Sequence, residues 1–350
     1  MPVTTTNLQT AKIIEISRFG PPEVLRLREE QVPEVGAEEV LIGVKAVGLN
    51  FADIFERLGL YKAAPKAPFV PGFEVSGIVE QVGQKVKRFK HGQNVIGITR
   101  FGGYKTLLKC HETFVCDLPA GFSFEEGAGF PTTYLTAYHG LFNLGHLKRG
   151  EKVLIHAAAG GVGTAAVQLA QIFDAEIFAT CGSQQKIAFL EEMGVQHGIN
   201  YRQQDFESAV RRINHGQGVD VIMDSVGGTT FRKGYQLLNP MGRLVIFGLG
   251  SMMPRGKRPN WFKLAYQYLT LPRFNPFDMM PDNKTIAAFH LAYMFNYVDA
   301  FQEAIGQLLR WANEGKIRPV IGKTFPFEQA GAAQNYLQSR KSVGKVVLTI

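Results

Sequence analysis

The chain of 350 residues carries 38 lysines and arginines against 30 aspartates and glutamates, and 45% of its residues are hydrophobic. The net charge of +8 suits polyanions and phosphate-rich cofactors alike, but no zinc finger, basic helix or aromatic RNA-binding motif accompanies it. We therefore expect no nucleic-acid partner. Three cysteines indicate a reducing compartment, and no secretory signal or membrane-length apolar run is visible, so we expect a cytoplasmic protein.

Short β-leaning runs fill the chain from residue 11 to about residue 131, and Pro-Pro, Pro-Gly and His-Gly-Gln turns separate them. This pattern predicts a compact and mainly antiparallel β unit. The runs are Lys12–Ile16, Val24–Glu29, Glu39–Val47, Val75–Val82 and Asn94–Ile98.

Helices and strands alternate from about Thr132 to Gly248, and repeated βα units at this spacing predict a doubly wound parallel sheet. The expected elements include helix Thr132–Leu144, strand Val153–Ile155 with its following helix, and strands Glu176–Thr180, Gly198–Tyr201, Val219–Asp224 and Arg243–Phe247. Later we expect strand Ala287–Tyr293, helix Val298–Asn313, strand Ile321–Pro326, helix Phe327–Ser339 and strand Lys345–Thr349. The last strands need a sheet to join, and the N-terminal β unit is the obvious host.

A glycine-rich turn follows the first strand of this alternating region. The strand Val153–Ile155 leads through small residues into a helix that begins near Val162. In the pattern Gly-x-Gly-x-x-Gly, Ala158 takes the first place and Gly160 and Gly163 the other two. A helix N-terminus reached this way offers free N–H groups to an anion such as a dinucleotide pyrophosphate. The alternative is a tight turn without a ligand.

The end of the next strand indicates which dinucleotide fits. NAD-binding folds place an acidic residue there for the ribose 2′-OH, whereas this chain reads Ala179-Thr180-Cys181-Gly182-Ser183. Ser183 can donate a hydrogen bond and Lys186 can supply a charge to a 2′-phosphate. The residues therefore favour NADPH, with an ordinary solvated Lys186 as the alternative.

Residues 251–280 form an insertion in which basic and aromatic side chains are interspersed. One interpretation is a membrane-surface or lid segment, because an anionic interface attracts that combination. The other is a long insertion that packs over the cofactor cleft or into a subunit interface. Prolines throughout the segment break any long amphipathic helix and favour the second interpretation.

Several longer stretches carry a family resemblance that covers nearly the whole chain. The stretches GLNFADIFERLGLY, PGFEVSGIVEQVG, HAAAGGVGTAAVQLA, INYRQQDF, VIMDSVGG and SRKSVGKVVL resemble, in this order, the zinc-independent quinone oxidoreductase branch of the medium-chain dehydrogenase/reductases. Within that branch, KGYQLLNPMGRLVIFGL and FHLAY are most similar to the vesicle amine transport protein group, which also has a basic insertion at this position.

The resemblance implies an α/β protein of two domains. A GroES-like β-rich catalytic domain would span residues 1–131 and be completed by residues 296–350. A doubly wound Rossmann domain that binds NADPH would span residues 132–295, with the insertion at 251–280. The resemblance also implies a homodimer.

The resemblance further assigns the site residues. Gly160–Val162 would lie along the pyrophosphate, and Asn50 and Tyr61 would line the place where nicotinamide meets substrate. The complete cofactor set is Asn50, Thr136, Ala159, Gly160, Gly161, Val162, Gly163, Ser183, Lys186, Tyr201, Phe247, Gly248, Leu249, Phe289 and Arg340. Of these, Ser183, Lys186, Tyr201 and Arg340 would surround the 2′-phosphate and adenine end.

Zinc ligands are replaced in this sequence. Zinc-dependent relatives place a cysteine where this chain has Asn50, and Gly-His-Glu where it has Gly72-Phe73-Glu74. Phenylalanine cannot bind a metal, and an amide is a poor zinc ligand. Cys110, His111 and Cys116 lack the spacing of a zinc site. We therefore predict an enzyme without metal.

The predicted activity is transfer of a hydride from NADPH to a conjugated quinone or enone, whose charge spreads onto a distant oxygen. Asn50 would orient a carbonyl or the nicotinamide ribose, and Tyr61 would donate a proton or hydrogen bond. Quinone reductases often have a further tyrosine where this chain has Phe55. Two alternatives remain: an enoyl-thioester reductase that uses Arg255–Arg258 for the phosphopantetheine arm, and a nucleotide-binding scaffold at membranes.

Three further polar residues are expected to be structural. Asp53 would lie in the first turn of a helix after Asn50, Asp224 would anchor the turn after its strand, and His156 would pack against the fold.

Overall fold

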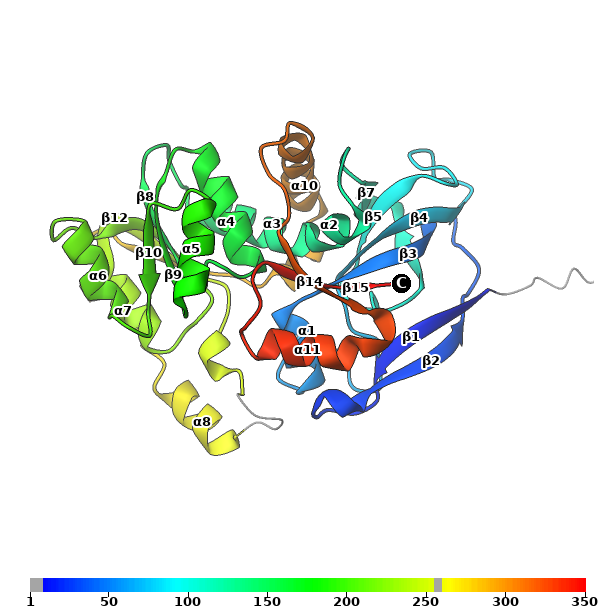
Figure 1. Ribbon diagram of the computed structural model, residues 1–350, viewed down its shortest axis with the longest axis horizontal. Coiled ribbons are helices and arrows are strands. Elements are labelled where there is room, and N and C mark those ends of the chain that lie inside the picture. The colour runs from blue at the N-terminus through cyan, green and yellow to red at the C-terminus, as the bar shows by residue number, and fades with distance from the viewer. Residues whose placement is uncertain (1–8, 255–259) are drawn as a thin grey trace, which may run out of the picture. The chain divides into compact units, whose positions relative to one another are not determined.

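The computed structural model describes residues 9–254 and 260–350. The chain forms two compact units (Figure 1): the first comprises Met1–Pro131, Ile321–Lys341 and Lys345–Ile350, and the second comprises Thr132–Val320 and Ser342–Gly344. The expected first domain also included residues 296–350. Residues 296–320 and the short segment Ser342–Gly344 belong to the second unit instead.

The first unit is built on a seven-stranded sheet in which β14, β15, β3, β4, β5 and β7 are successive neighbours and β6 pairs with β3. Its strands are β3 (Glu39–Leu49), β4 (Glu74–Val82), β5 (Asn94–Ile98), β6 (Leu107–His111), β7 (Val115–Asp117), β14 (Ile321–Pro326) and β15 (Lys345–Thr349), beside the ribbon β1 (Thr10–Ile16) and β2 (Leu25–Gln31). Its α-helices are α1 (Phe51–Arg57), α2 (Phe124–Gly129) and α11 (Ala330–Gln338), with 3-10 turns at Pro22–Val24, Glu112–Phe114 and Phe327–Gln329. The C-terminal strands thus join the N-terminal sheet, as expected.

The register of three strands positions the residues discussed below. β15 pairs antiparallel with β3, and Val346 lies opposite Leu49, so Lys345 comes next to Asn50. β4 also pairs antiparallel with β3, and Val75 lies opposite Val47. The ends of three strands that are far apart in sequence therefore meet at one place.

The second unit is a parallel six-stranded sheet in the order β10-β9-β8-β11-β12-β13, which is the doubly wound order of dinucleotide-binding folds. Its strands are β8 (Lys152–Ile155), β9 (Glu176–Cys181), β10 (His197–Asn200), β11 (Val219–Asp224), β12 (Leu238–Ile246) and β13 (Thr285–Ala288). Its α-helices are α3 (Pro131–Tyr138), α4 (Gly161–Ile172), α5 (Gln184–Glu192), α6 (Phe206–Ile213), α7 (Thr229–Leu237), α8 (Trp261–Leu269), α9 (Pro276–Met279) and α10 (Val298–Asn313).

The core of this sheet is made by the apolar runs that predicted its strands. One fully buried side chain comes from each of five neighbouring strands: Leu154, Phe178, Ile199, Ile222 and Leu244. Parallel strands are covered on both faces, so their sequences are continuously apolar and not alternating.

Two expected elements differ in the structure. The expected helix Thr132–Leu144 is α3, which ends at Tyr138, followed by a π-helical turn over His139–Leu144. Gly140 lies against the flexible end of the Met223 side chain, which would have to move to accommodate a Cβ at this position. The expected strand Ala287–Tyr293 is β13, which ends at Ala288 and gives way to a 3-10 segment, Leu291–Asn296.

The insertion contains the nine-residue helix α8 and the short helix α9, separated by a proline-containing turn, so no long helix forms among its described residues. Within the described part of the chain, none of the helices has the length and apolar character that spanning a membrane requires. Arg255, Lys257 and Arg258, which were considered for a basic channel, lie outside the described residues.

Candidate functional site

The glycine-rich turn of the second unit joins β8 to α4. Gly160 is the N-cap of α4, and no side chain caps this twelve-residue helix. A Cβ on Gly160 would touch only the carbonyl oxygen of Ala157, at 3.4 Å, so packing within the protein does not require glycine here. The open space beside an uncapped helix N-terminus fits a phosphate group.

Gly163 has a different role, because a Cβ there would come within 2.5 Å of the Cα and carbonyl carbon of Ala158. Close packing of the turn against the helix therefore demands glycine at the third motif position. Ala157 has a φ of +53°, a left-handed conformation that glycine adopts more readily. Ala159, Gly161 and Val162 complete the turn and the first residues of α4.

A segment near the C-terminus lies beside this turn. The N–H of Gly344 donates to the carbonyl of Ala159 at 2.8 Å, and Gly344 forms an isolated parallel bridge with Gly160. Lys186 Nζ donates to the carbonyl of Ser342 at 2.6 Å. Ser342–Gly344 was not predicted to lie here, although it is part of the motif SRKSVGKVVL, because its contacts are with residues far away in the sequence. Arg340 belongs to the first unit.

Four polar side chains gather at the end of β9. Ser183 caps α5 and accepts a hydrogen bond from the Lys186 N–H at 3.3 Å. A Cβ on Gly182 would lie 2.7 Å from the Tyr201 hydroxyl and 3.4 Å from Arg202 Nε. Burial lowers the pKa of Lys186, although Cys181 counteracts this, and the charge of Arg202 lowers it further. Arg202 was not among the expected site residues, yet it directly follows Tyr201.

The ends of β12 and β13 bring two aromatic rings together. Phe247 and Phe289 are stacked with ring centroids 6.0 Å apart and an angle of 23° between the rings. The ring of His139 meets Phe289 edge to face at 4.8 Å. Gly248 and Leu249 follow Phe247, whose N–H donates to the carbonyl of Asp224 at 3.0 Å. Both phenylalanines are half-buried, so part of each side chain is accessible next to the strand ends.

Three polar residues of this unit serve the fold. Thr136 donates its hydroxyl to the carbonyl of Thr132 in its own helix at 2.6 Å. Asp224 accepts from the N–H groups of Val226 and Gly227 and from the hydroxyl of Thr230, so it anchors the turn as predicted. His156 is buried, and its Nδ1 lies 2.9 Å from the Thr180 hydroxyl. Burial lowers its pKa and favours the neutral ring.

The first unit places Asn50 in a buried polar network. Asn50 Nδ2 donates to Glu74 Oε1 at 2.9 Å, and Asn50 Oδ1 accepts from Lys345 Nζ at 2.7 Å. Lys345 also donates to Glu74 Oε1 at 2.5 Å. Most of the hydrogen-bonding capacity of the Asn50 amide is therefore used within the protein.

Tyr61 is half-buried beside an aromatic cluster. Its ring meets Phe73 edge to face at 6.0 Å, and Phe73 in turn contacts Phe101 at 5.9 Å. Phe73 stands where zinc-dependent relatives have a histidine, so an apolar ring and two hydrogen-bonded side chains replace zinc ligands here. This set of donors does not fit zinc.

The two cysteines of the first unit are buried as well. Cys110 Sγ donates to the carbonyl of Ile98 at 3.2 Å, and burial raises the pKa of both Cys110 and Cys116 to about 12. Thiolates are therefore disfavoured at both positions. Over the described ranges, no group of three or more histidine, cysteine, aspartate or glutamate side chains could hold a metal ion.

A second buried polar group follows Asn50 along α1. Asp53 accepts from the Asn50 N–H and from the Tyr104 hydroxyl, both at 2.8 Å. Both carboxylate oxygens of Glu56 are buried without a hydrogen-bond partner. Burial raises the pKa of Asp53 to about 7, and burial, followed by the charge of Asp53, raises the pKa of Glu56 well above its usual value. Asp53 is thus structural, as predicted.

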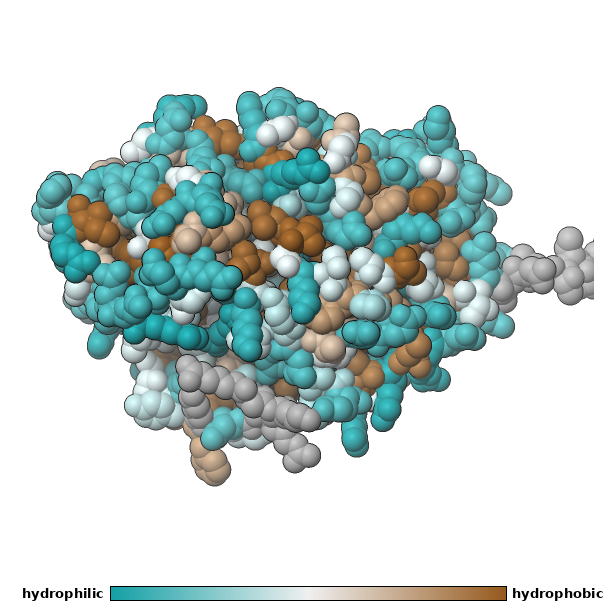
Figure 2. All heavy atoms as spheres, viewed as in Figure 1, coloured by the Kyte–Doolittle hydropathy of each residue, from teal (hydrophilic) through white to brown (hydrophobic). Residues whose placement is uncertain are grey.

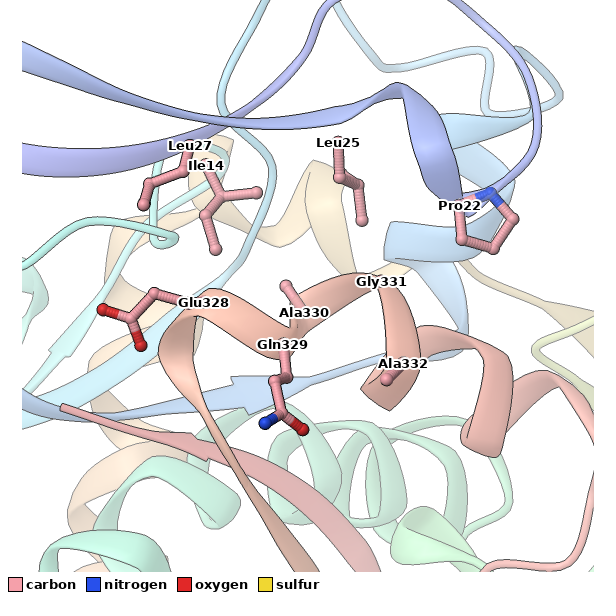
Figure 3. Close-up of a pocket in the computed structure, with 9 residues that line it drawn as sticks. All are labelled: Ile14, Pro22, Leu25, Leu27, Glu328, Gln329, Ala330, Gly331 and Ala332. Atoms are coloured by element: carbon pink, nitrogen blue, oxygen red, sulfur yellow. The ribbon is translucent and has the colours of Figure 1, made fainter.

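The first unit also contains a cavity of about 290 Å³ between the β1–β2 ribbon and the start of α11 (Figure 3). None of the expected site residues lines it. Its lining residues are Ile14, Pro22, Leu25, Leu27, Glu328, Gln329, Ala330, Gly331 and Ala332.

Comparison with known proteins agrees with this geometry. Residues 36–144 match the family described as alcohol dehydrogenase GroES-like domain, and residues 193–348 match the family described as zinc-binding dehydrogenase. The chain is 35% identical to the synaptic vesicle membrane protein VAT-1 homolog of Danio rerio over 342 residues, which cover 97% of this chain and 70% of that protein.

Two solved structures are also similar along their full lengths. The Escherichia coli quinone oxidoreductase complexed with NADPH is 30% identical with a TM-score of 0.85, and the match covers 97% of this chain and 100% of that one. The CurK enoyl reductase is 33% identical with a TM-score of 0.83, and the match covers 97% and 99%.

The GroES-like unit and the doubly wound unit with its glycine turn define a medium-chain dehydrogenase/reductase, which is an oxidoreductase superfamily. The predicted fold class is confirmed. The chain belongs to the zinc-independent quinone oxidoreductase branch of that superfamily, near the VAT-1 homologues. Membership supports a nicotinamide cofactor.

Proposed function

We propose that this protein is an NADPH-dependent oxidoreductase that reduces a conjugated quinone or enone. Two observations support the proposal. The glycine-rich turn of the second unit has open space at Gly160, and the end of β9 has no acidic residue but is surrounded by Ser183, Lys186, Tyr201 and Arg202. An acidic side chain there would repel a 2′-phosphate, whereas two cations attract it.

The remaining expected residues complete the cofactor site in this proposal. Gly160–Val162 would hold the pyrophosphate, and Phe247 and Phe289 would flank the nicotinamide end with Thr136, Gly248 and Leu249. Arg340 would join the 2′-phosphate group. When bound, NADPH would supply a hydride from C4 of its nicotinamide ring.

The choice of acceptor follows from the residues at the zinc-ligand positions. Asn50, Phe73 and Glu74 provide no Lewis acid, so an acceptor whose conjugation carries the charge to a distant oxygen is favoured. Tyr61 would donate a hydrogen bond or proton to that oxygen, and Asn50 would orient the carbonyl or ribose through its remaining N–H.

The decisive experiment is NADPH oxidation by the purified protein against a panel of quinones, enones and enoyl thioesters, with NADH in parallel. We expect turnover with at least one quinone or enone and a preference for NADPH. If NADPH is not consumed with any acceptor, the proposed activity is wrong. Turnover with thioesters alone would favour the enoyl-thioester reductase, an alternative supported by the similarity to the CurK enoyl reductase.

A peripheral membrane contact through residues 251–280 is a second proposal, and helix α8 supports it. Of its described side chains, Leu264 is buried, whereas Trp261, Phe262 and Leu269 are strongly exposed, with Phe262 92% exposed. Most of the surface visible in Figure 2 is hydrophilic. Apolar and aromatic side chains on an exposed helix suit a lipid interface.

Flotation with vesicles that contain phosphatidylserine tests this contact. We expect the protein to float with the vesicles, and the double variant Trp261→Ser/Phe262→Ser to remain in the soluble fraction. Tyr297→Ser, at an aromatic residue elsewhere in the second unit that is about as exposed as Trp261, is the matched control. Equal flotation of all variants would contradict the proposal. Size-exclusion chromatography with light scattering tests the homodimer that the family resemblance implies.

A further inference from the structure

A buried cation joins two residues of the first unit: Asn50, which stands where zinc-dependent relatives have a cysteine, and Glu74, which follows Phe73. Lys345 Nζ lies 2.7 Å from Asn50 Oδ1 and 2.5 Å from Glu74 Oε1. The Lys345 side chain is 4% exposed and that of Glu74 is fully buried. Asn50 Nδ2 closes the triangle with its 2.9 Å hydrogen bond to Glu74. The ammonium is therefore desolvated and held by two oxygen atoms.

The chemistry of the partners fixes the orientation of the Asn50 amide. A lysine ammonium can only donate and an ionised carboxylate can only accept, so Oδ1 must face Lys345 and Nδ2 must face Glu74. A flipped amide would set donor against donor and acceptor against acceptor. The second N–H of Asn50 reaches only the carbonyl of Gly48, at the long distance of 3.5 Å. At that length the hydrogen bond is weak, so this N–H can turn to a stronger acceptor on a ligand.

The backbone at two glycines lies close to the side chains of this network. A Cβ on Gly48 would come within 2.8 Å of Glu74 Oε1, and a Cβ on Gly129 would come within 3.3 Å of Lys345 Cγ. A metal ion bound by Asn50 and Glu74 would lie close to the Lys345 ammonium in a buried site. Two cations so close together repel each other strongly at low effective dielectric.

We propose that Lys345 is a built-in cation and a positioning residue, which holds the Asn50 amide with Oδ1 turned inward and a single N–H left for a ligand. It takes the place of the metal of zinc-dependent relatives as the positive charge next to Glu74. Lys345 acts through Asn50 and needs no contact with substrate. The consequence of Lys345 for hydride transfer rests on the proposed function, whereas the effect of Lys345 on the Asn50 amide does not.

Variants that remove one or both of the charges test whether Lys345 balances the charge of Glu74. Lys345→Met leaves a buried carboxylate without its counter-charge, and Glu74→Gln leaves a buried ammonium, so we expect each to lower the melting temperature by roughly 5–10 °C. The double variant Lys345→Met/Glu74→Gln should recover at least half of that loss because no unpaired charge remains. Lys45→Met, at an exposed lysine of β3, is the matched control and should leave the melting temperature unchanged.

Nuclear magnetic resonance of the protein with ¹⁵N-labelled asparagine side chains tests the positioning. The Asn50 amide signals, assigned with Asn50→Asp, should be protected from exchange in the wild type. In the double variant they should shift and exchange at least about tenfold faster, because Oδ1 has lost its donor. With an active acceptor, kcat should fall at least about tenfold while KM for NADPH stays unchanged, since positioning acts on the reacting groups.

The outcomes separate the two proposals. A double variant with recovered stability, unchanged Asn50 signals and wild-type kcat would show that Lys345 only balances charge, and the positioning role would be wrong. If the loss of stability in the double variant equals the sum of the two single losses, the charges of Lys345 and Glu74 do not balance each other. The proposal that Lys345 is a built-in cation would then be wrong. If none of the acceptors leads the wild type to oxidise NADPH, the proposed activity is wrong. The amide signals and melting temperatures then still decide the role of Lys345.

Discussion

The candidate site of the second unit is formed by backbone, whereas that of the first unit is formed by buried side chains. In the second unit the backbone of Ala159–Gly163 forms the site, with open space at Gly160 and partly exposed cations nearby. In the first unit Asn50, Glu74 and Lys345 are almost completely buried and use each other as partners. The backbone site depends on which positions lack a Cβ, whereas the buried network depends on the balance of charge.

The difference predicts which substitutions damage binding and which damage the fold. At the glycine turn, binding and folding depend on different glycines. In the first unit the same side chains serve both, so each single change alters stability.

Gly163→Ala should be the most damaging change at the turn, because its Cβ would collide with the backbone of Ala158. We expect a loss of about 2–3 kcal/mol in the free energy of unfolding, measured with urea. Gly160→Ala should leave unfolding within about 0.5 kcal/mol of the wild type but weaken NADPH binding at least tenfold. Equal loss of stability in both variants would contradict the division of roles.

Lys186→Ala should weaken NADPH binding about tenfold, equivalent to about 1.4 kcal/mol, because a charge next to the 2′-phosphate is lost. NADH binding should change little, and Arg202→Ala should behave in the same way. Fluorescence titration with both nucleotides measures the ratio. Lys148→Ala, at an exposed lysine of the same unit, is the control. A parallel loss for NADPH and NADH would mean that Lys186 only supports Ser342.

The stability of the first unit should fall as pH rises from about 4 through about 7, because the folded protein holds protons on Asp53 and Glu56 that the unfolded chain releases. Glu56→Gln removes one ionisable group and should raise the melting temperature at pH 8 by roughly 2–4 °C, with no gain near pH 4.

Glu38→Gln is the control for that experiment. Hydrogen bonding to Lys85 lowers the pKa of Glu38, so removing this carboxylate should not raise the melting temperature at pH 8. Thermal unfolding followed at pH 4, 6 and 8 compares the variants. A melting temperature of Glu56→Gln that parallels the wild type at all three values would contradict protonated acids in the core.

Ala157→Gly should stabilise the second unit by about 0.5–1 kcal/mol, because it relieves the left-handed conformation of Ala157. Ala158 is the opposite case, because its φ is not positive. We expect Ala158→Gly to lower the free energy of unfolding by about 0.5–1 kcal/mol. Urea unfolding of both variants measures the difference. Destabilisation of similar size in both would show that Ala157 carries no strain.

Sequence spacing predicted much of the second unit. Strand, small residues and helix lie within about twenty consecutive residues, so the phosphate turn could be predicted from local geometry alone. The missing acid after β9 is equally local. Arg202 was missed although it is adjacent to Tyr201, because its proximity to Gly182 arises only when β10 pairs with β9.

The C-terminal boundary shows what local patterns cannot supply. Helix α10 was correctly predicted over Val298–Asn313. It was expected in the first domain, whereas its contacts group it with the second unit, because helical periodicity does not specify which sheet a helix packs with. Ser342–Gly344 likewise joins the second unit, through the hydrogen bond between Gly344 and Ala159, although its neighbours on both sides belong to the first.

The sequence by itself determined the two folds, the glycine turn and the loss of zinc ligands at Asn50 and Phe73, since each depends on residue type at a short spacing. Only the tertiary structure decided that Lys345 lies between Asn50 and Glu74, which are 295 and 271 positions away from it. The physical reason is the antiparallel pairing of β3 with β15 and with β4. Hydrogen-bond registers across a sheet bring together side chains whose relation is not visible along the chain.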